Sequence, residues 1–258
     1  MEPVQLEVEH LTLHFGGLAA LSGVSLQVRR GERLSVIGPN GAGKTSLINC
    51  INGFYRPHRG RVRLEGRDIT GLPPHRVAAL GIGRAFQNIE LFLGMSVLDN
   101  LMLAQHRRLR YTLVDALLYY GRAQAQEIEA RRRVEDIIDF MDLEPYRHLP
   151  VGALPYGVQK RVEMARALAT GPRLLLLDEP MAGMTVEEKE DLARYILDAN
   201  EEMGITILLI EHDLRAVMDL SHRVVVLNFG RVIAEGAPEE AARHPDVVEA
   251  YLGEAVPA

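Results

Sequence analysis

The sequence predicts an α/β fold, in which a mostly parallel central sheet is joined to an antiparallel β subdomain and carries an inserted α-helical subdomain. Three short apolar stretches, each followed by a polar or glycine-rich turn, are typical of buried parallel strands: residues 33–37, 173–177 and 205–210. Alternating apolar and polar residues predict half-solvated antiparallel strands at 6–9, 24–28, 61–64, 224–227 and 231–234. Between residues 96 and 142, apolar side chains recur at helical spacing and predict the inserted subdomain.

The composition is that of an ordinary globular protein. The 258 residues are 47% hydrophobic and 25% charged, with a formal net charge of -6, which excludes a disordered, collagen-like or coiled-coil chain. No apolar run approaches the ~20 residues that span a bilayer, and we expect no secretory signal. Cys50 is the single cysteine and fits a reducing compartment. The acidic balance argues against nucleic acid as a partner.

A glycine-rich turn that follows the strand at residues 33–37 is the clearest motif. Residues 38–45 match the phosphate-binding pattern G-x-x-x-x-G-K-[ST]. In such a loop, backbone N–H groups surround phosphate oxygens, Lys44 contacts the β- and γ-phosphates, and Thr45 binds Mg²⁺. The predicted nucleotide-binding residues are Gly38, Pro39, Asn40, Gly41, Ala42, Gly43, Lys44, Thr45 and Ser46. The fold class is therefore a P-loop NTPase with a RecA-like core.

The use of lysine supports this motif. Among the 29 basic residues, only Lys44, Lys160 and Lys189 are lysines. Because the compact ammonium of lysine and the planar guanidinium of arginine are not interchangeable, the retained lysine in the loop indicates a specific role. For Lys160 and Lys189 we expect that arginine is tolerated.

Two other predicted core strands end in polar residues. Asp178 and Glu179 follow the strand at residues 173–177, and His212 follows the strand at residues 205–210. In α/β sheets, ligands bind at the carboxyl ends of the strands. We expect Asp178 to hold Mg²⁺ through water, Glu179 to polarise the attacking water, and His212 to contact the γ-phosphate.

In this order, the motifs resemble those of the nucleotide-binding subunits of ATP-binding-cassette transporters, and the resemblance covers about residues 6–252. It implies that Phe15 stacks on adenine and that Gln87 contacts Mg²⁺ and responds to the membrane partner. It places the family's signature at residues 154–159, including Gly157, and the D-loop at residues 182–185. It also makes His212 the switch histidine.

The resemblance implies a subunit organisation as well. The core with its antiparallel β subdomain comprises residues 1–92 and 170–258, and the helical signature subdomain comprises residues 93–169. Two such ATPase subunits, identical or related, enclose two ATP molecules with Mg²⁺ and drive integral membrane permease subunits. The chain is expected in the cytoplasm, on the inner face of the cell membrane, and a periplasmic or extracellular solute-binding protein takes part indirectly.

Within the family, three segments are similar to the branched-chain amino acid importer ATPases: residues 84–100, 107–129 and 238–253. The implied function is an ATP-hydrolysing motor subunit for import of branched-chain or other hydrophobic amino acids. Two alternatives stay open, the ATPase of a lipopolysaccharide-type exporter and a soluble ATPase of the same superfamily that acts on ribosomes or DNA. A kinase or GTPase is excluded because neither explains the signature region.

The chain departs from the family pattern at two positions. In the signature, Pro155 stands where serine is usual, and proline has neither a hydroxyl nor an N–H group. In the D-loop, Thr185 replaces aspartate. We therefore expect weakened activity in the composite site to which this chain donates its signature, and a heterodimer with one dominant hydrolytic site.

Overall fold

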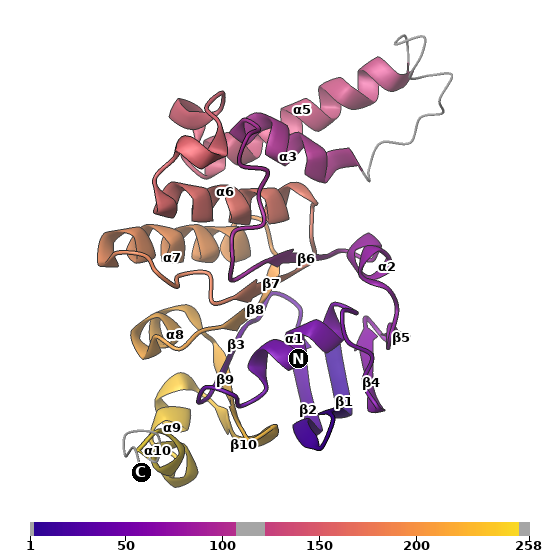
Figure 1. Cartoon of the computed structure of the whole chain (residues 1–258), viewed down its shortest axis with the longest axis vertical. Helices are drawn as coiled ribbons and strands as arrows, with labels where there is room; N and C mark the ends of the chain where they lie inside the picture. The colour runs from indigo at the N-terminus through magenta and orange to yellow at the C-terminus, as the bar shows by residue number, and fades with distance from the viewer. Residues whose placement is uncertain (1–2, 107–121, 253–258) are drawn as a thin grey trace.

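The computed structural model describes residues 3–106 and 122–252, and these form two sheets with helices around them (Figure 1). The central sheet has six strands in the order β10-β9-β3-β8-β7-β6. Their bounds are β3 (Arg33–Ile37), β6 (Ile82–Ala85), β7 (Leu174–Asp178), β8 (Thr206–Ile210), β9 (Arg223–Asn228) and β10 (Arg231–Gly236). All neighbours pair in parallel except β10, which is antiparallel to β9.

A second, antiparallel sheet covers one face of the core. Its order is β2-β1-β4-β5, with β1 (Val4–Phe15), β2 (Leu18–Arg29), β4 (Arg59–Leu64) and β5 (Arg67–Asp68). Helix α1 (Lys44–Ile51) packs in one hydrophobic cluster with both sheets, because its residues Leu47, Ile48 and Ile51 are completely buried there. The start of this helix, where the phosphate loop ends, is thereby fixed relative to the central strands.

The remaining helices surround the other parts of the central sheet (Figure 1). They are α2 (Pro74–Ala79), α3 (Val97–Gln105), α5 (Arg122–Phe140), α6 (Tyr156–Ala169), α7 (Val186–Glu201), α8 (Leu214–Leu220), α9 (Pro238–Ala242) and α10 (Pro245–Leu252), with 3₁₀ turns at Glu144–Tyr146 and Val151–Ala153. In β7, Leu174 and Leu176 face the antiparallel sheet, whereas Leu175 and Leu177 face α6 and α7. A strand covered on both faces needs a continuous apolar run, as the sequence indicated.

The structure confirms the strands predicted around residues 33–37, 173–177 and 205–210 and corrects two other assignments. The expectation that the strand at residues 224–227 is half-solvated is wrong, since these residues are buried and one edge of β9 pairs in parallel with β3. Only the other edge of β9 pairs antiparallel with β10. Strand β6 was not predicted, because it is short and contains Gly83 and Arg84.

The helices predicted between residues 96 and 142 are α3 and α5, which lie with α6 at one end of the molecule (Figure 1). Residues 107–121, which belong to the stretch at 107–129 that resembles the importer ATPases, lie outside the described residues. Within the described part of the chain, no helix is both long and apolar enough to cross a membrane.

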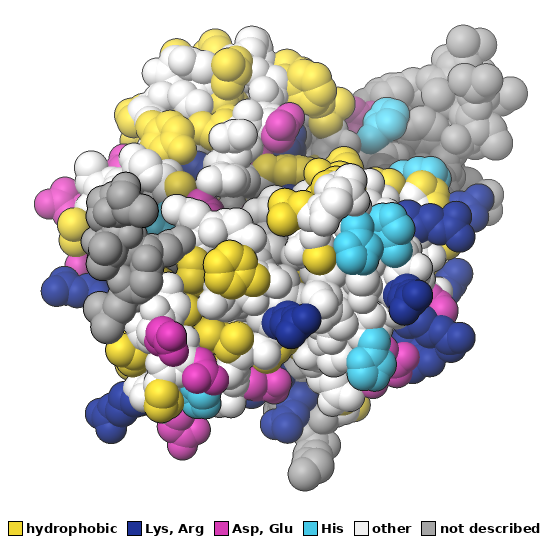
Figure 2. Space-filling model, turned by 60° about the horizontal axis from the view of Figure 1, so that its bottom comes forward, with side chains coloured by type: hydrophobic (Ala, Val, Ile, Leu, Met, Phe, Trp, Pro, Cys, Tyr) yellow, Lys and Arg dark blue, Asp and Glu magenta, His cyan; other side chains and the backbone are white. Residues whose placement is uncertain are grey.

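Charge is distributed unevenly over the surface. Figure 2 shows Lys, Arg and His side chains gathered toward its right side, which is the side of the antiparallel sheet in Figure 1. Arg59, Arg61 and Arg67 of β4 and β5 are among the exposed residues of that sheet. Although the net charge of the chain is negative, basic side chains are therefore concentrated on the side of the antiparallel sheet.

Candidate functional site

A pocket of about 490 Å³ lies where the phosphate loop meets the ends of the central strands. It is lined by loop residues 40–46, by Phe15 and Ala20 of the antiparallel sheet, and by Glu179 at the end of β7. The structure thus brings together most of the residues that the sequence marked for nucleotide binding. Gly38 and Pro39 form the beginning of the same loop, outside the lining of this pocket.

The loop has the backbone that its glycines permit. Gly41 and Gly43 have φ values of 77° and 104°, and a Cβ atom at Gly43 would come within 2.4 Å of the Ala20 carbonyl oxygen. Lys44 is 7% exposed, and its ammonium donates to the carbonyl oxygens of Gly38 at 2.7 Å and Pro39 at 3.0 Å. The loop is therefore preformed around a cationic group at the positive end of α1.

Asp178 is nearly completely buried at the end of β7, with 2% of its surface exposed. Its Oδ2 accepts a hydrogen bond from Arg84 of β6 at 2.9 Å, and its Oδ1 is a buried oxygen with no partner among the described residues. Burial raises the pKa of Asp178, and the nearby Arg84 charge opposes that shift. A buried carboxylate oxygen with a free lone pair is the kind of group that binds a hard cation.

Arg84 is a residue that the sequence analysis missed. Its guanidinium also donates to the Asn49 side chain at 2.7 Å and lies 4.5 Å from the centre of the Phe86 ring. Burial lowers the pKa of Arg84, while Asp178 raises it. Asp178 lies 94 positions away from Arg84 along the chain. Only the pairing of β6 with β7 could therefore have indicated the contact between Arg84 and Asp178.

Glu179, Gln87 and His212 meet beside the pocket. Gln87 Nε2 donates to Glu179 Oε2 at 2.7 Å, and His212 Nδ1 lies 3.8 Å from the same oxygen. Glu179 has a φ of 47°, which is uncommon for a residue with a side chain and which other contacts must hold in place. Its N–H group donates to the carbonyl of Ile210 at the end of β8. Three separate elements thus converge on one carboxylate.

Aromatic side chains line the open side of the pocket. Phe15 is 46% exposed and packs edge-on against Tyr55, with 5.2 Å between the ring centres. Phe229 in the β9–β10 turn also lines the pocket and is 84% exposed. The sequence analysis predicted Phe15 but not Phe229, whose turn residues gave no sign of a contact with the loop.

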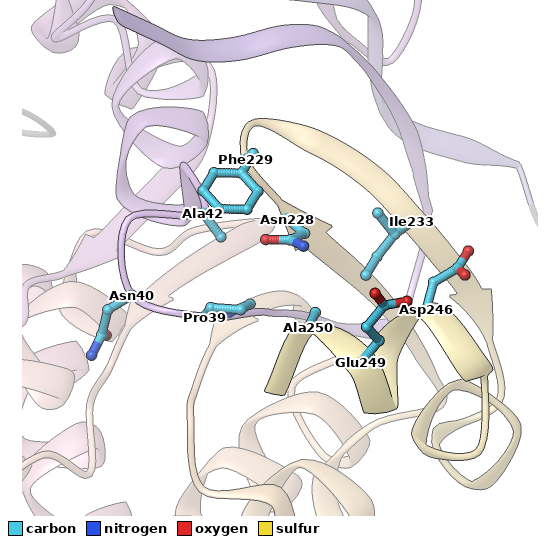
Figure 3. A pocket seen from close by; sticks show the side chains of 9 residues that line it. All are labelled: Pro39, Asn40, Ala42, Asn228, Phe229, Ile233, Asp246, Glu249 and Ala250. Carbon is cyan, nitrogen blue, oxygen red and sulfur yellow. The ribbon is translucent and has the colours of Figure 1, made fainter. Parts of the chain in front are cut away.

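A second pocket, of about 460 Å³, borders the loop on its other side (Figure 3). In Figure 3, Pro39 and Ala42 of the loop and Phe229 face Ile233 of β10 and Glu249 of α10 across it. Pro39 belongs to this pocket rather than to the one that contains Lys44. The two pockets share the loop residues Asn40 and Ala42 and the turn residue Phe229.

The structure does not bring Gly157 to the pocket that contains Lys44. Gly157 lies in the first turn of α6, where an added Cβ would come within 2.2 Å of the Glu188 carboxylate. Pro155 is the N-cap of the same helix, and no side chain caps it. Thr185, the other departure from the family pattern, caps α7, since its Oγ1 accepts from Glu188 N–H at 3.3 Å.

Comparison with known proteins decides the family. A family model described as ABC transporter matches residues 21–182. This chain belongs to the ABC transporter family. A second model, described as branched-chain amino acid ATP-binding cassette transporter, matches residues 231–257.

Curated relatives cover nearly the whole chain. The chain is 44% identical to the high-affinity branched-chain amino acid transport ATP-binding protein BraF of Pseudomonas aeruginosa, over 97% of this chain and 98% of that protein. It is 41% identical, with the same coverage, to the corresponding protein LivG of Escherichia coli strain K12. A probable LivG of Methanocaldococcus jannaschii is 36% identical over 96% of this chain and 97% of its own.

Solved structures agree with this assignment. An ATP-binding cassette of an ABC transporter in its ADP conformation has a TM-score of 0.85 and 34% identity, over 97% of this chain and 99% of that one. A dimeric bacterial ABC transporter cassette has a TM-score of 0.76 and 25% identity, over 90% of this chain and 98% of its own. The fold is that of a P-loop NTPase, and the chain is an ATPase of this family. Such ATPase subunits bind ATP, dimerise and work with membrane permease components.

Proposed function

We propose that the chain is the ATP-hydrolysing subunit of an importer for branched-chain or other hydrophobic amino acids. The observation that carries the proposal is the identity of 44% with a branched-chain amino acid transport subunit, which extends over 97% of the chain. The match of residues 231–257 to a branched-chain model supports the same solute class. The relatives do not favour the two alternatives, a lipopolysaccharide-type exporter and a soluble ATPase.

The residues around the loop fit ATP and Mg²⁺. Lys44 neutralises charge on the β- and γ-phosphates, and residues 40–46 surround them with N–H groups. The Thr45 hydroxyl, the Gln87 side chain and the unpaired Oδ1 of Asp178 would hold Mg²⁺. When bound, the ion neutralises phosphate charge in the transition state.

Glu179 is the proposed general base, because it is the carboxylate that lines this pocket, it accepts a hydrogen bond from Gln87, and His212 lies beside it. The hydrogen bond from Gln87 orients the Glu179 carboxylate, which in this proposal takes a proton from the attacking water. His212 lies beside it on the exposed side and contacts the γ-phosphate. Phe15 offers an aromatic face for adenine.

The second ATPase subunit completes each site in this proposal. Gly157 lies on α6, outside the pocket of its own chain, so it serves the ATP that is bound to the partner. The helical segment 93–169 moves as a signature subdomain against the core, residues 1–92 and 170–258. Closure of the two subunits on ATP then drives the permease.

The permease docks, in this proposal, on a groove of about 260 Å³ between the core and the helices. Phe92 and Leu103 line this groove and are 58% and 42% exposed, whereas Leu91 is buried. Leu91 thus belongs to the core, and Phe92 is available as contact surface. Docking here would hold the chain at the inner face of the cell membrane, with a solute-binding protein acting from the other side.

Purification from membranes of the source organism tests the proposal. We expect the tagged chain to co-purify with hydrophobic permease subunits and a second ATPase, and the reconstituted assembly to hydrolyse ATP in response to a binding protein loaded with leucine, isoleucine or valine. Isolation with export components, or with ribosomes, would overturn it.

A further inference from the structure

The segment between β6 and α3, residues 86–92, is held by side chains of the helical part. Its backbone groups from Phe86 to Phe92 receive hydrogen bonds from, or donate them to, residues of α6 and α3. We call this segment the Gln87 segment. Within this segment, the Gln87 side chain is the one that forms a hydrogen bond with the Glu179 carboxylate. The segment therefore connects the helices to the general base.

Lys160 provides the contact nearest to Gln87. It lies in the second turn of α6, is 3% exposed, and its Nζ donates to the Gln87 carbonyl oxygen at 2.5 Å. A buried ammonium is costly unless it is well paired. Burial lowers the pKa of Lys160, and Glu163, three residues further along the same helix, opposes that shift. This burial argues against the sequence expectation that Lys160 tolerates arginine.

Glu163 holds the segment on either side of that carbonyl. It is 2% exposed, and its two carboxylate oxygens accept from the N–H groups of Phe86 and Glu90, each at 3.4 Å. Arg166, three residues further on, lies 3.6 Å from Glu163 and donates to the Glu90 carbonyl at 2.5 Å. Lys160 and Arg166 thus donate to backbone carbonyls of the segment, and the Glu163 carboxylate accepts from its N–H groups. Such charge-assisted hydrogen bonds are stronger than those between neutral groups.

The far end of the segment is fixed by α3. Asn100 is completely buried, its Oδ1 accepts from Phe92 N–H at 2.9 Å, and its Nδ2 donates to the Phe92 carbonyl at 3.1 Å. The backbone of the segment is therefore bound to the helices at both ends, while the Gln87 side chain reaches the core. Any rotation of α6 carries the Gln87 backbone with it.

We propose that Lys160 and Glu163 are positioning residues, which hold the Gln87 segment so that the Gln87 amide stays on Glu179. The inference rests on the proposed function and adds to it the physical link between the signature helix and the general base. It assigns to α6 a role in this chain's own ATP site, besides the one that its first turn has in the partner's site.

A double-mutant cycle on the co-purified assembly tests the link. Lys160→Met keeps the length of the side chain and removes the donor, so kcat for Mg-ATP should fall roughly tenfold to a hundredfold, the scale of a small misplacement, with KM nearly unchanged. In a Gln87→Ala background the same substitution should change kcat by less than about twofold, because residues that act through one another are not additive. Should Lys160→Met fail to fold, Glu163→Gln, which is nearly isosteric, is put through the same cycle with the same expectation.

Arg161→Met is the matched control. Arg161 is the next residue of α6 and also donates to a carbonyl, that of Met141, at 3.3 Å. It donates to the Tyr195 hydroxyl of α7 at 3.2 Å as well, and neither contact involves the Gln87 segment. The Arg161→Met substitution should change kcat by the same factor in the wild-type and in the Gln87→Ala background. An equal effect of Lys160→Met in both backgrounds would show a merely structural role and overturn the proposal. A wild-type assembly that hydrolyses no ATP would instead refute the proposed function.

Discussion

The pocket of the α/β core and the first turn of α6 differ in how many of the groups that could contact ATP this chain supplies. Around the core pocket, Lys44 is buried in a preformed loop, and Glu179 is held by Gln87 and His212. At the start of α6, Pro155 takes the N-cap position without a hydroxyl or an N–H group. In the proposed function, one chain would thus carry a complete half of one ATP site and a weakened half of another.

The two regions also differ in what fixes them. The loop lies between two sheets and a buried helix, so the core pocket is set by packing within one chain. The first turn of α6 has no side-chain cap at Pro155, and the Glu188 carboxylate of α7 lies against Gly157 in that turn. In the proposed function, the core pocket binds ATP and holds the general base, whereas the first turn of α6 contributes donors to the ATP that is bound to the opposite subunit.

The largest effect is expected at the general base. Glu179→Gln should bind Mg-ATP about normally and lose hydrolysis by roughly a hundredfold or more, because the amide accepts no proton. The ATP-bound dimer should then accumulate, which a doubled mass in light scattering would show. Glu202→Gln, an exposed substitution at the end of α7, is the control. Retained turnover in Glu179→Gln would remove this residue from the mechanism.

The next effect concerns the loop. Lys44→Arg puts a planar fork where the ammonium fits between two carbonyls. Overpacking of a filled site costs about 1–3 kcal/mol, which corresponds to roughly 5- to 150-fold in ATP affinity. Titration calorimetry measures it. Lys189→Arg, on a half-exposed lysine, should leave affinity unchanged, and equal tolerance at both positions would contradict the argument from lysine usage.

The smallest effect concerns stability, at the ion pair between Lys189 of α7 and Asp213 at the start of α8. Lys189 Nζ donates to Asp213 Oδ2 at 2.8 Å and lowers the pKa of Asp213. A lowered folded-state pKa stabilises the protein above the unfolded value, about 3.9, and this contribution is lost as the pH falls through the folded value. Lys189→Met should therefore cost less than about 1 kcal/mol at pH 7. Urea unfolding should show the difference shrinking below about pH 4, and a difference independent of pH would contradict it.

The sequence predicted the parts of the fold that depend on local pattern. The strands β3, β7 and β8 have nearly continuous apolar runs that are followed by polar or glycine-rich turns. The loop matches a phosphate-binding motif of defined spacing. For residues 224–227 the same reasoning failed, because a hairpin partner, β10, suggested an antiparallel strand although β9 also pairs in parallel with β3.

Contacts between distant residues could not be predicted in this way. The contact of Arg84 with Asp178 and the contact of Lys160 with Gln87 depend on how β6 and α6 pack against the central strands. Neither Arg84 nor Lys160 stands in a motif with a defined spacing. Their roles depend on charges buried by tertiary packing, which no local pattern records.

The asymmetry between the two regions is tested most directly by the ATPase rate of the purified chain alone, compared with its Pro155→Ser variant. In a homodimer both sites would lack a serine hydroxyl and an N–H donor, and loss of one preorganised donor costs roughly 2.7–4 kcal/mol in hydrolases. We therefore expect slow turnover by the wild-type chain, and a rise of about 10²-fold or more in the variant or with a partner that carries an intact signature. Brisk turnover by the wild-type chain, with no gain from either change, would contradict the account.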